Sequence, residues 1–122
     1  MSHPTIRKVA VLGAGVMGTG IAAHLANAGI DSLLFDIVPK DATDRNASAN
    51  AGIASAKKLK PAPLFRNEDA SRITACNMED DGGRLAECDW IVEVVVERLD
   101  IKEKVFAWVA EHRKPGSVVS SN

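Results

Sequence analysis

The sequence contains no tyrosine, and aromatic residues make up only 4% of its 122 positions. A surface that stacks bases or sugars on aromatic rings is therefore not expected. The excess of positive charge that marks nucleic-acid-binding proteins is also missing, because 15 Lys and Arg face 16 Asp and Glu. No apolar run approaches the ~20 residues that a membrane-spanning helix needs, and the first residues lack the pattern of a secretion signal.

Cysteine is scarce as well, with Cys76 and Cys88 as its two occurrences. They stand 12 positions apart, without a C-x-x-C pair and without histidines at the spacing of a metal site. We therefore expect no metal site and predict that both thiols are small buried apolar groups. Their number and spacing suit a reducing compartment, which favours the cytoplasm.

What the sequence does contain is 46% hydrophobic residues in short runs, enough for one compact domain over residues 1–122. These runs alternate between strand-like and helix-like patterns. The expected strands are residues 6–12, 32–35, 73–76, 90–96 and 117–120, and the expected helices are residues 16–28 and 101–112. Residues 41–59 are expected to hold a helix or a helical hairpin. This alternation predicts an α/β fold with a doubly wound parallel sheet.

A glycine motif follows the first expected strand and opens the first helix. Residues 13–18 read GAGVMG, which is a G-x-G-x-x-G pattern inside a strand–helix–strand unit. Gly13 would permit a tight turn, Gly15 would let a pyrophosphate approach the backbone, and Gly18 would let the helix pack on the strand. The N-terminus of the helix, at Val16 and Met17, would attract the phosphates. The motif in this context predicts a Rossmann-type dinucleotide site, although a glycine turn without a ligand remains the alternative.

Asp36 ends the second expected strand, 18 residues after Gly18. An acid at this place accepts hydrogen bonds from an adenosine ribose and repels a 2′-phosphate, so NAD is favoured over NADP. The residue that follows is Ile37 rather than an arginine, but Lys40 is near. A solvated aspartate at the end of a strand is the alternative interpretation.

The fourth expected strand carries two acids and precedes a lysine. Glu97 lies just past this strand, at the edge where ligands bind in such sheets. Glu93 lies within the apolar run, so it needs a partner or an exit to water, and it is either a paired structural carboxylate or a polar group of the site. Lys102 falls in the first turn of the next helix, against the helix dipole, which indicates either a ligand or ion-pair role or a solvated side chain.

Three stretches of this sequence resemble 3-hydroxyacyl-CoA dehydrogenases. Residues 9–22 read VAVLGAGVMGTGIA, and residues 89–97 read DWIVEVVVE, with Lys102 five positions further on. The final SSN resembles the start of the S-N-T-S segment of that family. The pattern looks most like the bacterial multi-domain members that act in fatty-acid β-oxidation.

The resemblance implies an NAD-binding Rossmann domain followed, in the full enzyme, by a helical domain that binds substrate and forms dimers. It implies that NAD is the cofactor and that six residues contact it: Met17, Asp36, Val95, Val96, Glu97 and Lys102. It also implies that the long segment after the second strand helps to bind the CoA part of an acyl-CoA substrate. The nearest candidates there are Ser55, Lys57 and Lys58, and a solvated helix face is the alternative for the two lysines.

The family's catalytic serine, histidine and glutamate lie beyond residue 122, so no catalytic residue is expected within this chain. The full enzyme would oxidise 3-hydroxyacyl-CoA to 3-ketoacyl-CoA, with a histidine as the base. Two other hypotheses stay open: the Rossmann half of a related 3-hydroxy acid dehydrogenase, and a non-catalytic module that binds a dinucleotide.

Overall fold

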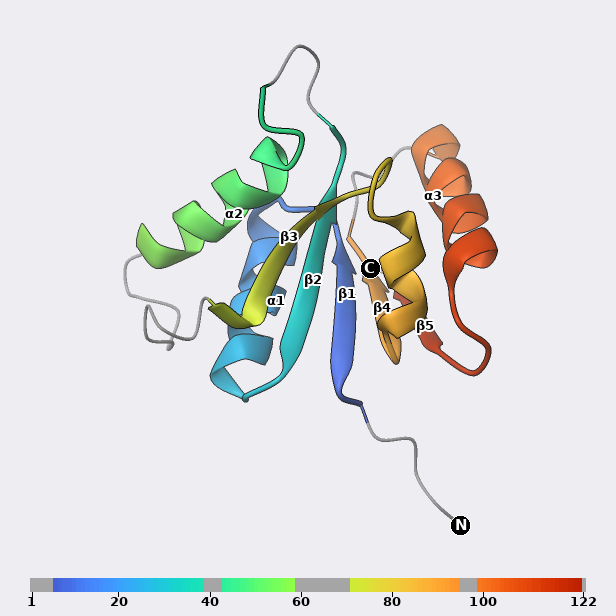
Figure 1. The fold of residues 1–122 in the computed structure, drawn as a ribbon, viewed down its shortest axis with the longest axis horizontal. Helices are drawn as coiled ribbons and strands as arrows, with labels where there is room; N and C mark the ends of the chain where they lie inside the picture. The colour runs from blue at the N-terminus through green and yellow to red at the C-terminus, as the bar shows by residue number, and fades with distance from the viewer. Residues whose placement is uncertain (1–5, 39–42, 59–70, 95–98, 122) are drawn as a thin grey trace.

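A parallel five-stranded sheet forms the centre of the protein (Figure 1). The structure is a computed structural model and describes residues 6–38, 43–58, 71–94 and 99–121. All neighbouring strands are parallel, in the order β3-β2-β1-β4-β5. The strands are β1 (Lys8–Leu12), β2 (Asp31–Asp36), β3 (Ile73–Asn77), β4 (Trp90–Glu93) and β5 (Val118–Ser121). The predicted doubly wound parallel sheet is confirmed.

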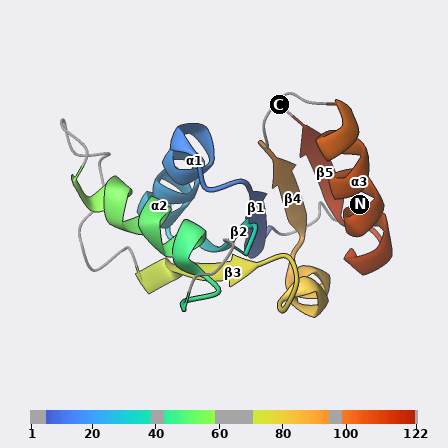
Figure 2. The same cartoon turned by 90° about the horizontal axis from the view of Figure 1, so that it is seen from above.

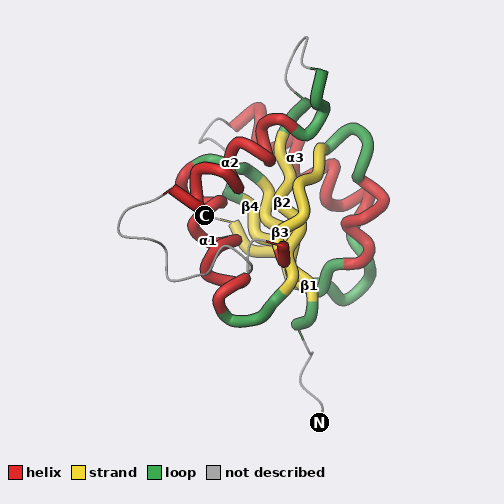
Figure 3. The backbone as a smooth tube through the Cα atoms, turned by 60° about the vertical axis from the view of Figure 1, so that its left-hand side comes forward, coloured by secondary structure: helices red, strands yellow, loops and turns green. Residues whose placement is uncertain are grey.

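Helices cover both faces of this sheet, as Figures 2 and 3 show. Helices α1 (Val16–Asn27) and α2 (Ala47–Lys58) lie on one face, whereas α3 (Leu99–His112) and the short 3-10 helix η2 (Gly82–Glu87) lie on the other. Among the described residues, none of these helices combines the length and apolarity required to cross a membrane. A helix or a helical hairpin was expected within residues 41–59, and the described residues of this segment form one helix, α2.

Strands β1 to β4 contribute alternate side chains to two separate apolar cores. In β1, Val9 and Val11 pack toward α1 and α2, and Ala10 and Leu12 pack toward α3 and η2. All four are fully buried. The nearly continuous apolar run that predicted a strand buried on both faces is thus explained by the central place of β1 in the sheet. This burial is the main favourable contribution to folding.

The two cysteines lie in the core on the α3 side of the sheet, and both are fully buried. Burial raises the pKa of Cys76 to about 11 and the pKa of Cys88 to about 12. The thiolate is the reactive form, so both thiols are poor nucleophiles at neutral pH. The prediction of small buried apolar groups is confirmed.

All five strands differ from the prediction at one end or both, and the largest differences at a single end are in the first and fourth strands. The first strand starts at Lys8 rather than at residue 6, and the fourth ends at Glu93 rather than at residue 96. In the sheet, Glu93 is in register with Leu12, the last residue of β1, and with Ser121, the last residue of β5. The apolar run continues beyond Glu93, so the end of this strand is set by its neighbours and not by a local stop signal.

Asn77 connects α2 to the end of β3. It is 2% exposed, and its side-chain amide donates to the Asn46 side-chain oxygen (2.8 Å) and to Asp80 (3.0 Å). Its own side-chain oxygen accepts from the backbone N–H of Asp80 (2.7 Å). This buried amide is therefore hydrogen-bonded on both sides, and it fixes the segment that leads into α2 against the carboxyl end of β3.

Asp89 ties three segments together at the opposite edge of the sheet, where the strands begin. Its carboxylate accepts the backbone N–H groups of Arg7 (2.9 Å) and Lys8 (3.1 Å), and it pairs with the Lys114 ammonium. The ammonium and these N–H groups lower the pKa of Asp89 from 3.8 to about 2. The group therefore favours the folded state in its ionised form.

We predict that Asp89→Asn lowers the free energy of unfolding by about 1 kcal/mol at pH 7. Because the folded-state pKa lies below the unfolded one, the contribution is complete above pH 3.8 and fades as the pH falls toward 2. Urea unfolding of both proteins across this pH range measures the difference. If the difference in the free energy of unfolding between the two proteins stayed constant down to pH 2, the role of the ionised carboxylate would be contradicted.

Candidate functional site

The turn between β1 and α1 lies at the carboxyl edge of the sheet, the edge at which all five strands end. Gly13 has a φ of 117°, a conformation that glycine adopts without strain. Its N–H donates to the carbonyl oxygen of Phe35 (2.8 Å), and the N–H of Ala14 donates to the Asp36 carboxylate (2.8 Å). The predicted tight turn is confirmed, and its backbone is held against the end of β2.

Gly18 brings α1 into close contact with this turn. A Cβ atom at Gly18 would lie 1.7 Å from the Gly13 carbonyl oxygen and 3.0 Å from a methyl group of Val94. No side chain fits at these distances, so close packing of helix and strand requires glycine here, as predicted. The hydroxyl of Thr19 then donates to the Ala14 carbonyl oxygen (3.0 Å) and closes the turn from the helix side.

The N-terminus of α1 is open to a ligand. Its cap residue is Gly15, which makes no side-chain cap, and the first turn holds no acidic residue. In the part of the chain that the structure describes, a Cβ at Gly15 would have no neighbour within 4 Å. Val16 is 88% exposed and Met17 is 56% exposed, which is unusual for large apolar side chains. An uncapped helix N-terminus with free space before it is suited to bind an anion.

Asp36 lies beside this turn at the end of β2. One carboxylate oxygen accepts the N–H of Ala14, and the other accepts the N–H of Ile37 (2.7 Å). The side chain is half-buried, and the adjacent Ile37 is 64% exposed. The structure thus brings the predicted acid and the predicted glycine turn together, with the carboxylate oriented by the turn itself.

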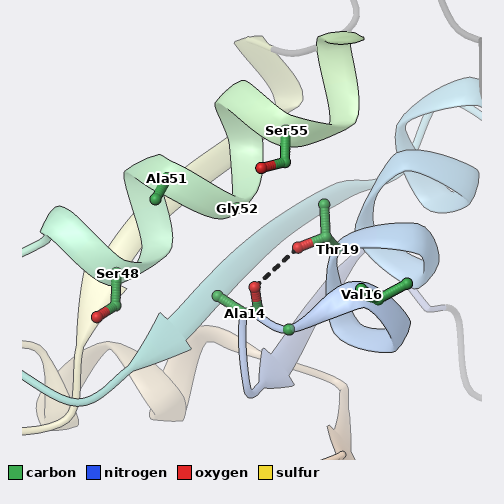
Figure 4. Close-up of a pocket in the computed structure, with 8 residues that line it drawn as sticks. Ala14, Val16, Thr19, Ser48, Ala51, Gly52 and Ser55 are labelled. Atoms are coloured by element: carbon green, nitrogen blue, oxygen red, sulfur yellow. Dashed lines mark hydrogen bonds between the residues drawn. The ribbon is translucent and has the colours of Figure 1, made fainter. Parts of the chain in front are cut away.

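A cleft of about 260 Å³ separates the start of α1 from α2 (Figure 4). Its wall includes Ser48 and Ser55 from α2, which face the turn. At Gly52, helix α2 comes into close contact with the glycine turn and the start of α1. A Cβ there would lie 2.8 Å from the Thr19 hydroxyl and 2.9 Å from the Ala14 carbonyl oxygen. Sequence reasoning identified Ser55 but missed Ser48 and Gly52. The sequence signal that could have indicated this close contact was a glycine within an alanine-rich helix.

Glu93 and Lys102 meet at the same edge, on the β4 and β5 side. The Glu93 carboxylate is fully buried, and the Lys102 ammonium lies 3.4 Å from one of its oxygens. The Ser121 hydroxyl donates to that same oxygen (2.6 Å). The hypothesis of a paired carboxylate at Glu93 is confirmed, and Lys102 is part of an ion pair.

Five predicted site residues lie, wholly or in their side chains, outside the described part of the structure. Val95, Val96 and Glu97 lie outside the described residues. Lys57 and Lys58 belong to the last turn of α2, and their side chains also lie outside the described part of the structure.

The histidines of the described segments lie away from the carboxyl edge. His24 is exposed on α1, about 12 Å along the axis from the start of the helix. His112 is at the far end of α3, where its Nδ1 bonds the Trp108 carbonyl oxygen (2.8 Å). Within residues 6–38, 43–58, 71–94 and 99–121, no group of three or more His, Cys, Asp or Glu is arranged to hold a metal ion.

The family model and the relatives that this chain matches all point to the same family. Residues 8–122 match the family described as "3-hydroxyacyl-CoA dehydrogenase, NAD binding domain". A probable 3-hydroxyacyl-CoA dehydrogenase of Bacillus subtilis is 52% identical over 98% of this chain, and one of Deinococcus radiodurans is 47% identical over 96%. The chain spans only 17% and 34%, respectively, of the lengths of these two relatives.

Solved structures agree on the fold. The (S)-3-hydroxybutyryl-CoA dehydrogenase of Ralstonia eutropha superposes with a TM-score of 0.73 at 24% identity, over 97% of this chain and 41% of that one. The 3-hydroxybutyryl-CoA dehydrogenase of Escherichia coli gives a TM-score of 0.70 at 29% identity, over 98% of this chain and 25% of that one. With the family match over residues 8–122, the chain belongs to the NAD-binding domain family of 3-hydroxyacyl-CoA dehydrogenases.

Proposed function

We propose that the carboxyl edge of this sheet holds NAD, with its pyrophosphate at the N-terminus of α1. The observation that carries this proposal is the free space at Gly15 before an uncapped helix. At a helix N-terminus the backbone N–H groups point out of the helix toward a ligand, and the helix dipole adds partial positive charge. The exposed Val16 and Met17 supply apolar surface beside the phosphates.

Asp36 would hold the adenosine ribose. Both of its carboxylate oxygens already accept a backbone N–H, and each oxygen has a second lone pair for a ribose hydroxyl. The exposed Ile37 offers an apolar surface for the adenine ring. On the other half of the edge, Lys102 would hold the nicotinamide side of the cofactor, together with Val95, Val96 and Glu97, whose roles rest on the family resemblance.

For the whole protein we propose oxidation of 3-hydroxyacyl-CoA to 3-ketoacyl-CoA in fatty-acid β-oxidation. NAD, when bound, accepts the hydride in this chemistry. The part of the protein in residues 1–122 would bind and orient the cofactor, and a further helical domain would supply the base and the contacts of a homo-oligomer. The names of the relatives and a putative trifunctional enzyme of Rickettsia felis, 38% identical over 96% of this chain, support the proposal.

The substrate would be an acyl-CoA, not a nucleic acid. Its CoA part would contact the carboxyl-terminal end of α2, at Ser55, Lys57 and Lys58. Ser55 lines the cleft next to the glycine turn, which supports its place near the cofactor. We place the protein in the cytoplasm, because a reducing compartment keeps the two buried thiols free.

NAD should bind this chain at least about tenfold more tightly than NADP. The Asp36 carboxylate would accept the ribose hydroxyls of NAD, whereas it would repel the 2′-phosphate of NADP. Isothermal titration calorimetry with each cofactor measures the ratio. Equal affinities for NAD and NADP would contradict the assignment of Asp36 to the ribose site.

Gly15→Val should abolish detectable NAD binding and leave the melting temperature nearly unchanged. Among the described residues a Cβ at Gly15 meets no atom within 4 Å, so we expect the valine to fit the fold and to occupy the proposed position of the pyrophosphate. Gly20→Val is the matched control, because Gly20 lies within α1 rather than at its cap and, among the described residues, a Cβ there also has no neighbour within 4 Å. Normal NAD affinity in Gly15→Val would place the phosphates elsewhere.

The chain alone should not reduce acetoacetyl-CoA with NADH. Hydride transfer to the ketone needs a group that donates a proton within hydrogen-bond reach. Of the described histidines, His24 and His112 lie away from the carboxyl edge. A steady-state absorbance assay tests this expectation. Turnover on the order of 10 per second, typical of enzymes, would show that residues 1–122 contain the proton donor.

A further inference from the structure

Glu93 is a charged residue at one of the most buried positions in the sheet. Its exposed fraction is 0%, and its neighbours Ile91 and Val92 in β4 are buried apolar residues. A carboxylate without water is unfavourable unless other groups pair with it. Two such groups come from separate elements: the Lys102 ammonium of α3 and the Ser121 hydroxyl of β5.

Each residue of this ion pair is unfavourable in the element that carries it, Glu93 in β4 and Lys102 in α3. An aliphatic residue in place of Glu93 would suit the apolar strand, and replacement of a buried ion pair by apolar groups is often neutral or stabilising. Lys102 lies in the first turn of α3, where a positive charge opposes the helix dipole. Stability alone therefore does not account for these two residues, and their contact points to a functional role.

The position of the pair within the fold supports this interpretation. Glu93 is the last residue of β4 and is in register with Leu12, directly before the glycine turn. Asp36 ends β2 on the other side of β1, one residue beyond Phe35, which is the β2 partner of Leu12. Ligands in sheets of this type bind where the strand order reverses, which is between β1 and β4. The ion pair thus lies at the second half of the binding edge.

We propose that Glu93 is a positioning residue that, with Ser121, holds the Lys102 ammonium in the orientation that contacts the bound dinucleotide. This inference rests on the proposed function, because it takes Lys102 to be a cofactor contact. A lysine side chain has many rotamers, and a buried carboxylate fixed by a strand restricts them before the cofactor arrives. The Ser121 hydroxyl fixes the carboxylate oxygen in turn. The entropy cost of ordering the Lys102 side chain when the cofactor binds is then smaller.

A double-mutant cycle on NAD affinity tests the proposal, measured by calorimetry on the 122-residue chain. Glu93→Gln and Lys102→Met should each weaken NAD binding by about tenfold, the loss expected for one charged contact. The double variant should bind NAD no more weakly than Lys102→Met alone, because Glu93 acts only through Lys102. A merely structural effect of Glu93→Gln would instead add to the loss in the Lys102→Met background.

Asp89→Asn provides the matched control. Asp89 also pairs with a lysine, Lys114, but at the opposite edge of the sheet, just before β4. This variant should lose stability and keep the NAD affinity of the original chain. Ser121→Ala is a second variant at a solvent-exposed residue, and it should weaken NAD binding about threefold through loss of one hydrogen bond. It keeps the proposal testable if Glu93→Gln fails to fold.

Nitrogen-15 NMR of the Lys102 ammonium gives a readout without NAD. Its order parameter should fall in Glu93→Gln and in Ser121→Ala, because the ammonium gains rotational freedom. An unchanged order parameter, an undiminished effect of Glu93→Gln in the Lys102→Met background, or unchanged NAD affinity in both single variants of Glu93 and Ser121 would overturn the proposal. Failure of the original chain to bind NAD would instead overturn the proposed function, while the NMR result would still report on the ion pair.

Discussion

The contact between Gly18 and the Gly13 carbonyl is the constraint on which the rest of the site depends. The start of α1 can lie on the end of β1 only because no Cβ atom stands between them. This approach places the open N-terminus of the helix at the carboxyl edge of the sheet. A second close approach, at Gly52, then brings α2 against the same turn and forms one wall of the cleft. Two close approaches at glycines, at Gly18 and at Gly52, thus give the site its shape.

Charged side chains flank this turn on two sides, and each is held by a different part of the fold. Asp36 on β2 is bonded to the backbone of the turn itself, so the ribose site and the phosphate site form one unit. Glu93 on β4 is bonded to α3 and β5 instead. The proposed adenosine half therefore lies within one strand–helix–strand unit, whereas the proposed nicotinamide half joins β4, α3 and β5.

Sequence patterns predicted the element types well and the element ends less well. Helix α1 was expected over residues 16–28 and runs over Val16–Asn27. The fourth strand was expected to reach residue 96, but its pairing in the described residues ends at Glu93. Apolar character is a property of single residues, and it continues beyond the point where β1 and β5 stop offering partners. Strand length is decided by neighbouring strands, which a local pattern does not contain.

The sequence by itself determined the glycine turn, the acid that ends β2 and the alternation of strands and helices. These features follow from spacing within about thirty residues, where chain geometry leaves few alternatives. Only the tertiary structure decided that Glu93 pairs with Lys102 and Ser121, and that Gly52 lies against Thr19. Such contacts depend on strand order and register. Those are set by the packing of the whole core, so residues distant in the chain become neighbours only when the sheet is complete.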